Sequence, residues 1–118
     1  MVRVEQLADA AIRGEALLLR SLVQDFLREN ATLSAAAAPS SDDANVIAVS
    51  AGLIELLAER RQQPAPQWSR DVPGASQAIY LVKSALTMPR LKRMCDTESP
   101  LPLRRRNIFA PPTYLEFA

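Results

Sequence analysis

Two short basic runs in the second half of the chain carry the side chains best suited to binding chemistry. The residues are Arg90, Lys92 and Arg93, followed by Arg104, Arg105 and Arg106. Guanidinium and ammonium groups bind the phosphates of nucleic acid or the carboxylates of a protein. We expect the second run to contact a protein partner and the first run to meet phosphate or acidic groups. The alternative is a solvated edge that pairs with the acidic first half of the chain.

Charge is distributed unevenly along the chain. Residues 1–60 hold five Arg and no Lys against nine acids, a net −4, whereas residues 61–118 hold nine Lys/Arg against four acids, a net +5. Such asymmetry is typical of a basic face for an acidic partner, or of two halves that pack together. The total of only +1 is unusual for a dedicated DNA-binding domain, so we rank nucleic acid behind a protein partner.

Large apolar side chains follow the second basic run. Ile108 and Phe109 come directly after the arginines, an arrangement in which charge steers a partner and apolar groups anchor it. The simpler alternative is that they close the domain's own core, and for Phe109 we favour it slightly. Tyr114, Leu115 and Phe117 also require burial, because chain ends fray unless something holds them.

Residues for catalysis are sparse. The chain has no histidine, which excludes Ser-His-Asp and Cys-His pairs and histidine metal sites. Its one cysteine, Cys95, cannot form an internal disulfide or a thiolate zinc cluster, and we expect a small apolar residue rather than a reactive thiol. The acid pairs Asp42–Asp43 and Glu55–Glu59 fit helix capping and a solvated helix face. We therefore predict no enzyme, no cofactor and no metal.

Composition favours a helical domain. The chain of 118 residues fits one domain, 1–118, and its 48% hydrophobic content supports a core. Aromatic residues are only 5% and glycines number 3, so Leu, Ile, Val and Ala must build that core, and Ala and Leu favour helix. The first residues do not resemble a signal peptide and no apolar run reaches membrane-span length, so we expect a cytoplasmic protein without membrane contact.

The first half of the chain is predicted to form three helices. Apolar residues at helical spacing predict a helix over residues 3–13, a C-cap at Gly14 and a second helix over 15–30. Residues 34–43, SAAAAPSSDD, predict a flexible linker whose end caps the next helix from Ser41, Asp42 or Asp43. That third helix has the broadest apolar face and ends before Pro64.

The second half alternates connections and shorter helices. Residues 62–75 predict an ordered connection in which Trp68 plugs the core. A fourth helix is predicted over 76–87, and Pro89 suits the first turn of a fifth. Four prolines after Ser99 predict an extended tail over 99–118. The expected fold is all-α, a compact array of four to five helices with an extended C-terminal tail.

Three stretches resemble a family of small uncharacterised bacterial proteins. These are PAPQW at 64–68, AIYLVKSA at 78–85 and ESPLPLRRRNIFAPPTYLEF at 98–117. Similar endings occur in antitoxin-like proteins and regulators encoded beside a nucleotidyltransferase-like gene, and the piece from Arg104 to Phe109 is the most specific. The resemblance implies a small helical partner protein that neutralises a toxin enzyme. The first sixty residues lack a regulator-type helix-turn-helix, which argues against direct operator binding.

These observations predict a non-enzymatic protein-interaction module, the antitoxin or accessory subunit of a bacterial two-gene pair. The predicted partner-binding residues are Arg104, Arg105, Arg106, Ile108 and Phe109, and the predicted phosphate or acid contacts are Arg90, Lys92 and Arg93. The alternatives are a nucleic-acid-binding accessory protein that uses the basic segment 90–106, and a structural protein. The sequence is also compatible with a homo-oligomer.

Overall fold

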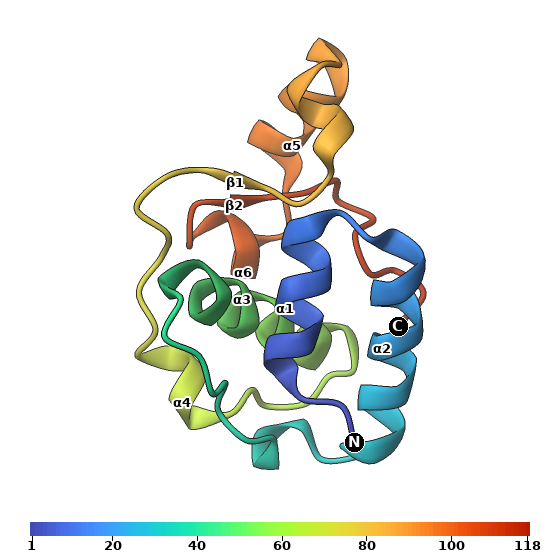
Figure 1. Cartoon of the computed structure of the whole chain (residues 1–118), viewed down its shortest axis with the longest axis vertical. Helices are drawn as coiled ribbons and strands as arrows, with labels where there is room; N and C mark the ends of the chain where they lie inside the picture. The colour runs from blue at the N-terminus through green and yellow to red at the C-terminus, as the bar shows by residue number, and fades with distance from the viewer.

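The computed structural model describes the whole chain, residues 1–118, as a compact and mainly helical fold. It confirms the predicted fold class and adds a two-stranded sheet (Figure 1). The elements are α1 (Val4–Arg13), α2 (Ala16–Glu29), the 3-10 helix η1 (Leu33–Ala35), α3 (Ala44–Arg60), α4 (Gln67–Arg70), β1 (Ile79–Tyr80), the 3-10 helix η2 (Lys83–Leu86), α5 (Pro89–Glu98), α6 (Leu101–Arg104) and β2 (Ile108–Phe109).

Helices α1 and α2 form a tight hairpin at Gly14, as the spacing of apolar residues predicts. Gly14 has φ 72°, a left-handed conformation that glycine adopts without steric cost, and its N–H caps the carbonyls of Ala10 and Ala11. A Cβ at this position would also lie 3.1 Å from the aliphatic stem of Lys83. The joint therefore requires glycine both for its backbone and for its space.

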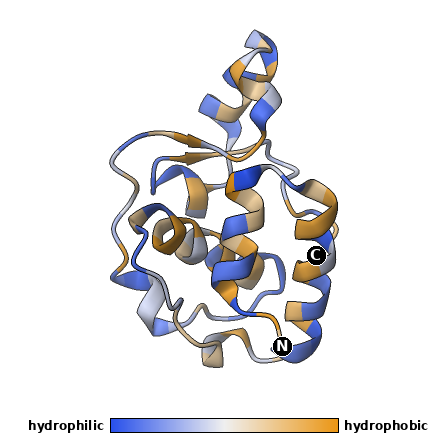
Figure 2. Ribbon diagram, in the orientation of Figure 1, coloured by the Kyte–Doolittle hydropathy of each residue, from blue (hydrophilic) through white to orange (hydrophobic).

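Helix α3 is the centre of the molecule. Every residue from Ala48 to Ala58 is buried, because α1, α4, α6 and η1 all pack against it. Asp43 caps its start by accepting hydrogen bonds from the backbone N–H groups of Asn45 and Val46, which confirms one of the three predicted caps. The buried hydrophobic residues of α1, α2 and α3 belong to one core cluster, and Figure 2 shows the hydrophobic stretches of these helices along the ribbon.

The predicted linker, residues 34–43, has specific contacts along the body. The indole Nε1–H of Trp68 donates to the carbonyl of buried Ala36 at 2.9 Å, and the N–H of Ser40 donates to Glu5 Oε2 at 3.2 Å. Trp68 packs against the core from α4, as predicted for the connection 62–75. The flexibility of the segment stays a prediction.

The prediction of a helix over residues 76–87 is wrong. Instead Ile79 and Tyr80 form β1, which runs parallel to β2 with Ile79 opposite Ile108 and Tyr80 opposite Phe109, and η2 follows. A short apolar run fits a strand as well as a helix, and the partner strand lies far along the chain. The rings of Tyr80 and Phe109 stack with centroids 5.3 Å apart, so tertiary pairing outweighs local propensity here.

The extended tail predicted over 99–118 needs a second correction, because the segment is not continuously extended. Residues 101–104 form the helical turn α6, with Pro102 in its first turn, where a missing N–H costs nothing. Asn107, at φ 64°, then redirects the chain into β2. Leu103, Ile108 and Leu115 are almost fully buried, so the tail completes the domain's own core.

No helix of the structure is both long enough and apolar enough to cross a lipid bilayer.

Candidate functional site

The three tail arginines, predicted to act together, lie in three different environments. Arg104 is exposed, and its Nη1 donates to the carbonyl of Thr97 at 2.8 Å. The side chain of Arg105 is half exposed, at 53%. Arg106 is only 4% exposed. In this fold the three do not form one surface, and Arg106 is enclosed by its own domain.

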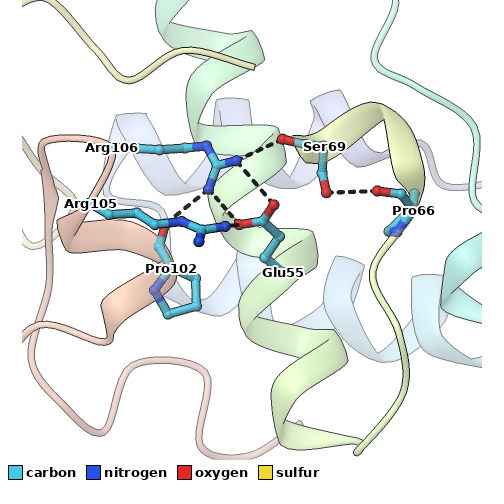
Figure 3. A network of polar contacts seen from close by, with 6 residues as sticks. All are labelled: Glu55, Pro66, Ser69, Pro102, Arg105 and Arg106. Atoms are coloured by element: carbon cyan, nitrogen blue, oxygen red, sulfur yellow. Dashed lines mark hydrogen bonds and ion pairs between the residues drawn. The ribbon is translucent and has the colours of Figure 1, made fainter. Parts of the chain in front are cut away.

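Arg106 forms a buried ion pair with Glu55 of α3 (Figure 3). Its Nη1 donates to Glu55 Oε1 at 2.5 Å and its Nη2 to Oε2 at 3.0 Å, the paired geometry that suits guanidinium and carboxylate. The same guanidinium donates to the carbonyls of Ser69 at 2.6 Å and Pro102 at 3.3 Å. The residue thus ties together α3, α4 and α6.

Glu55 also accepts a hydrogen bond from Arg105, so one carboxylate faces two guanidinium groups. Burial by itself raises the pKa of Glu55. The hydrogen bonds from Arg106, the neighbouring Ser69 and Arg105, together with the charge of Arg106, outweigh it and hold that pKa below its ordinary value. Glu55 was expected on a solvated helix face beside Glu59. That expectation is wrong for Glu55, which is 7% exposed, and correct for Glu59.

Sequence reasoning missed the role of Glu55, although a signal was present. It is the one charged residue among the eleven buried positions from Ala48 to Ala58. A lone acid within so apolar a helix must be paired, since an isolated buried carboxylate is very costly. The three consecutive arginines of the tail were one source of the opposite charge.

The apolar residues of the tail also contact their own domain. Ile108 is fully buried, and half-buried Phe109 stacks on Tyr80. Leu115 is 3% exposed, whereas Phe117 is 39% exposed with the guanidinium of Arg20 5.3 Å above its ring. Of the predicted partner-binding residues, only Arg104, Arg105 and part of Phe109 are left accessible to another molecule.

The most exposed part of the molecule is an arm of residues 83–98, which comprises η2 and α5. It projects from one end of the long axis (Figure 1), where the molecule measures 38 Å against 26 and 25 Å across. Only Ala85 and Cys95 of the arm are buried. Leu86 and Met88 at its turn are 65% and 52% exposed, which leaves two large apolar groups in solvent.

The predicted phosphate or acid contacts all lie on this arm, but they are not equivalent. Lys92 pairs with Asp96 at 3.3 Å and lies 5.3 Å above the ring of Tyr80. The hydroxyl of Tyr80 also donates to Asp96, and this hydrogen bond, ahead of burial, raises the pKa of Tyr80. Arg90 and Arg93 are exposed and form no ion pair, so of the three predicted contacts these two are available to a ligand. Lys83, at the start of the arm, is a third exposed cation without an ion pair.

Cys95, on α5, behaves as a buried apolar residue of the arm. It is fully buried, and that burial, followed by the charge of Asp96, raises the pKa of its thiol. A raised pKa disfavours the thiolate, which is the nucleophile. The finding agrees with the expectation of an inert cysteine.

Two of the hollows on the surface border the Glu55–Arg106 pair and the tail. The larger, about 790 Å³, is a polar cleft beside the Glu55–Arg106 pair, and its lining includes Glu59, Arg70 and Arg105. The smaller, about 470 Å³, lies between the α1–α2 hairpin and the tail and is lined mostly by apolar side chains. Both volumes fall within the range of small-molecule sites.

Comparison with known proteins adds no relative. No family model matches the sequence, and neither the curated proteins nor the solved structures gave a significant match. The resemblance to antitoxin-like bacterial proteins therefore stays a prediction, and function must be argued from the exposed arm and the cleft.

Proposed function

We propose that this chain is a non-enzymatic protein-interaction module that binds the acidic face of a partner protein through its projecting arm. The observation that carries the proposal is the combination on one projection of two free guanidinium groups, Arg90 and Arg93, with two exposed apolar groups, Leu86 and Met88. Arginine and methionine are both enriched at protein interfaces.

The arm suits a partner with carboxylates around an apolar pocket. Burying an exposed Leu or Met side chain contributes about 1.5–3 kcal/mol, and a charged hydrogen bond from arginine to carboxylate contributes about 1.5–3 kcal/mol. The excess of positive charge in residues 61–118 steers such a partner toward this end of the molecule.

This proposal moves the main contact from residues 104–109 to the arm. Arg106 and Ile108 are occupied inside the domain, and an interface that needed them would have to open the core. Arg104 lies near the end of α5, where it bonds Thr97, and it can extend the basic surface of the arm. The nucleotidyltransferase-like protein implied by the family resemblance is the partner to test first.

The experiment compares charge reversal on the arm with a matched reversal elsewhere. The test variant is Arg90→Glu/Arg93→Glu, and the control is Arg28→Glu/Arg61→Glu, which changes net charge equally at exposed positions outside the arm. A partner captured from the native host is purified, and the binary complex is re-formed from pure components. Titration calorimetry then gives the affinity of each variant.

We expect the arm variant to bind at least about a hundredfold more weakly, because two close charge pairs become repulsive. The control should stay within about threefold of the parent. Leu86→Ser/Met88→Ser should also weaken binding, but without changing its dependence on salt. Equal affinities of the arm variant and the control, or no binary complex from pure components, would refute the proposal.

Nucleic acid is the second candidate, favoured by the same two free arginines. Two phosphate contacts predict that log K falls by about 1.8 per log unit of salt on duplex DNA. Fluorescence anisotropy with labelled duplex DNA and RNA at low salt tests this directly. Binding that Arg90→Glu/Arg93→Glu abolishes would favour nucleic acid over a protein partner, and no binding at low salt would remove it.

A further inference from the structure

The polar cleft of about 790 Å³ lies on the body of the molecule and shares no lining residue with the arm. Its walls come from α3, from the segment around α4 and from α6, so three elements distant in sequence border it. Its charged lining residues are Glu55, Glu59, Arg70, Arg105 and Arg106. Three guanidinium groups thus face two carboxylates, and the cleft carries one excess positive charge.

The surplus charge can be assigned to Arg105. Arg106 alone satisfies both oxygens of Glu55, with Nη1 on Oε1 at 2.5 Å and Nη2 on Oε2 at 3.0 Å. Arg105 adds a single further bond to Oε1, and its side chain is 53% exposed. It can therefore turn toward a ligand in the cleft while the buried carboxylate keeps a full partner.

Arg70 supplies a second cation to the same cleft. It is exposed and forms no ion pair, and it ends α4 directly after Ser69. The carbonyl of Ser69 accepts from Arg106 Nη2 at 2.6 Å, which fixes the backbone beside Arg70 against the ion pair. Gly74 closes the wall, because a Cβ there would lie 2.9 Å from the Arg106 backbone.

We infer that this cleft binds an oxyanion group, the carboxylate or phosphate of a small molecule, between Arg70 and Arg105. The planar fork of a guanidinium matches the paired oxygens of both groups, and two such forks in one cleft favour a ligand that carries them. The volume leaves room for more than the anion itself. Glu59, exposed in the lining, offsets part of the attraction and makes the site weak for a bare ion.

The test uses inorganic phosphate and succinate as probes, with sodium chloride at equal ionic strength as the reference. Trp68, the only tryptophan, lies on α4 two residues before Arg70, so its fluorescence reports on the site in the unmodified protein. We expect saturable binding of at least one probe, with a dissociation constant of about 1 mM, and calorimetry as the second readout. Preference for one probe identifies the class of ligand.

Variants then locate the site. Arg70→Gln and Arg105→Gln should each weaken binding about tenfold, the loss of one charged hydrogen-bonding partner. Glu59→Gln should strengthen it several-fold, because a repelling carboxylate is removed. Arg104→Gln is the matched control, a neighbouring exposed arginine outside the cleft, and should leave binding unchanged.

Circular dichroism of each variant separates loss of binding from loss of fold, and Arg70→Gln breaks no side-chain hydrogen bond or ion pair. The inference is overturned if chloride reproduces the phosphate and succinate responses, or if neither probe binds. It is also overturned if Arg104→Gln weakens binding as much as Arg70→Gln and Arg105→Gln.

Discussion

The buried pair of Glu55 and Arg106 makes a sharp prediction about stability. In Arg106→Met the carboxylate stays buried and loses two of its three donors, while the carbonyl of Ser69 loses its bond to the guanidinium. Removing one member of a buried pair costs about 3–5 kcal/mol. Arg105 still bonds Glu55, so we expect the lower end, about 3 kcal/mol, or roughly a hundredfold rise in the unfolding constant.

The matched variants separate the charge from the packing. Glu55→Leu/Arg106→Met removes both charges and should regain at least about 2 kcal/mol of the loss, since no buried ion is left unpaired. Arg104→Met places the same substitution on an exposed neighbour and should change stability by less than about 0.5 kcal/mol. Urea unfolding, followed by circular dichroism and Trp68 fluorescence, measures all three.

The dependence on pH gives a second signature. The hydrogen bonds to Glu55 hold its pKa in the folded protein below the ordinary value, about 4.3, so the pair stabilises the fold above that pH and loses its contribution as pH falls further. In Arg106→Met fewer hydrogen bonds oppose the effect of burial on the pKa of Glu55. Protonation of Glu55 in acid then removes the buried charge. The cost of the substitution should therefore shrink between pH 7 and pH 4. A cost below about 1 kcal/mol at pH 7, or one that grows in acid, would refute this account.

Other perturbations follow from the same contacts. Deleting residues 104–118 removes buried Ile108 and Leu115 and should abolish cooperative unfolding in circular dichroism, whereas a tail that binds only a partner would leave helicity intact. Gly14→Ala should lower stability by about 1–2 kcal/mol in urea, because φ is 72° and Lys83 fills the space. Asp43→Ala should cost about 1 kcal/mol by loss of the α3 cap, and an unchanged urea midpoint would contradict it. Cys95 should react with Ellman's reagent at pH 8 only as fast as the protein opens.

Local patterns in the first half were sufficient to predict the elements there. Apolar spacing, Gly14 and Asp43 specify α1, α2 and α3 through contacts within a few residues, and these helices begin and end close to the predicted positions. The second half depends on distant partners. Ile79 pairs with Ile108, which lies 29 residues further along the chain, and no local sequence pattern indicates such a distant partner.

The candidate sites show the same contrast between local sequence patterns and contacts made only on folding. Arginine clusters are visible in sequence, and Arg90 and Arg93 are exposed as the clusters suggested. The identical run Arg104–Arg106 contains one exposed, one half-exposed and one buried side chain, and only the turn at α6 decides which is which. A cleft built by α3, α4 and α6 could not be predicted, because its walls meet only after folding.

The hydrogen bonds between the arm and the body of the molecule affect how the arm can bind a partner. Ser99, at its base, is buried, and its hydroxyl accepts from the N–H of Ala110 at 2.9 Å while lying 2.5 Å from the carbonyl of Cys95, to which it can donate. Tyr80 and Lys92 converge on Asp96 from the neighbouring strand and from α5 itself. The bonds of Ser99 and Tyr80 tie α5 to the tail and to the sheet, and so hold the arm against the folded body. A projection that is already ordered loses little conformational entropy on binding, which is what an exposed contact of only a few side chains requires to reach useful affinity.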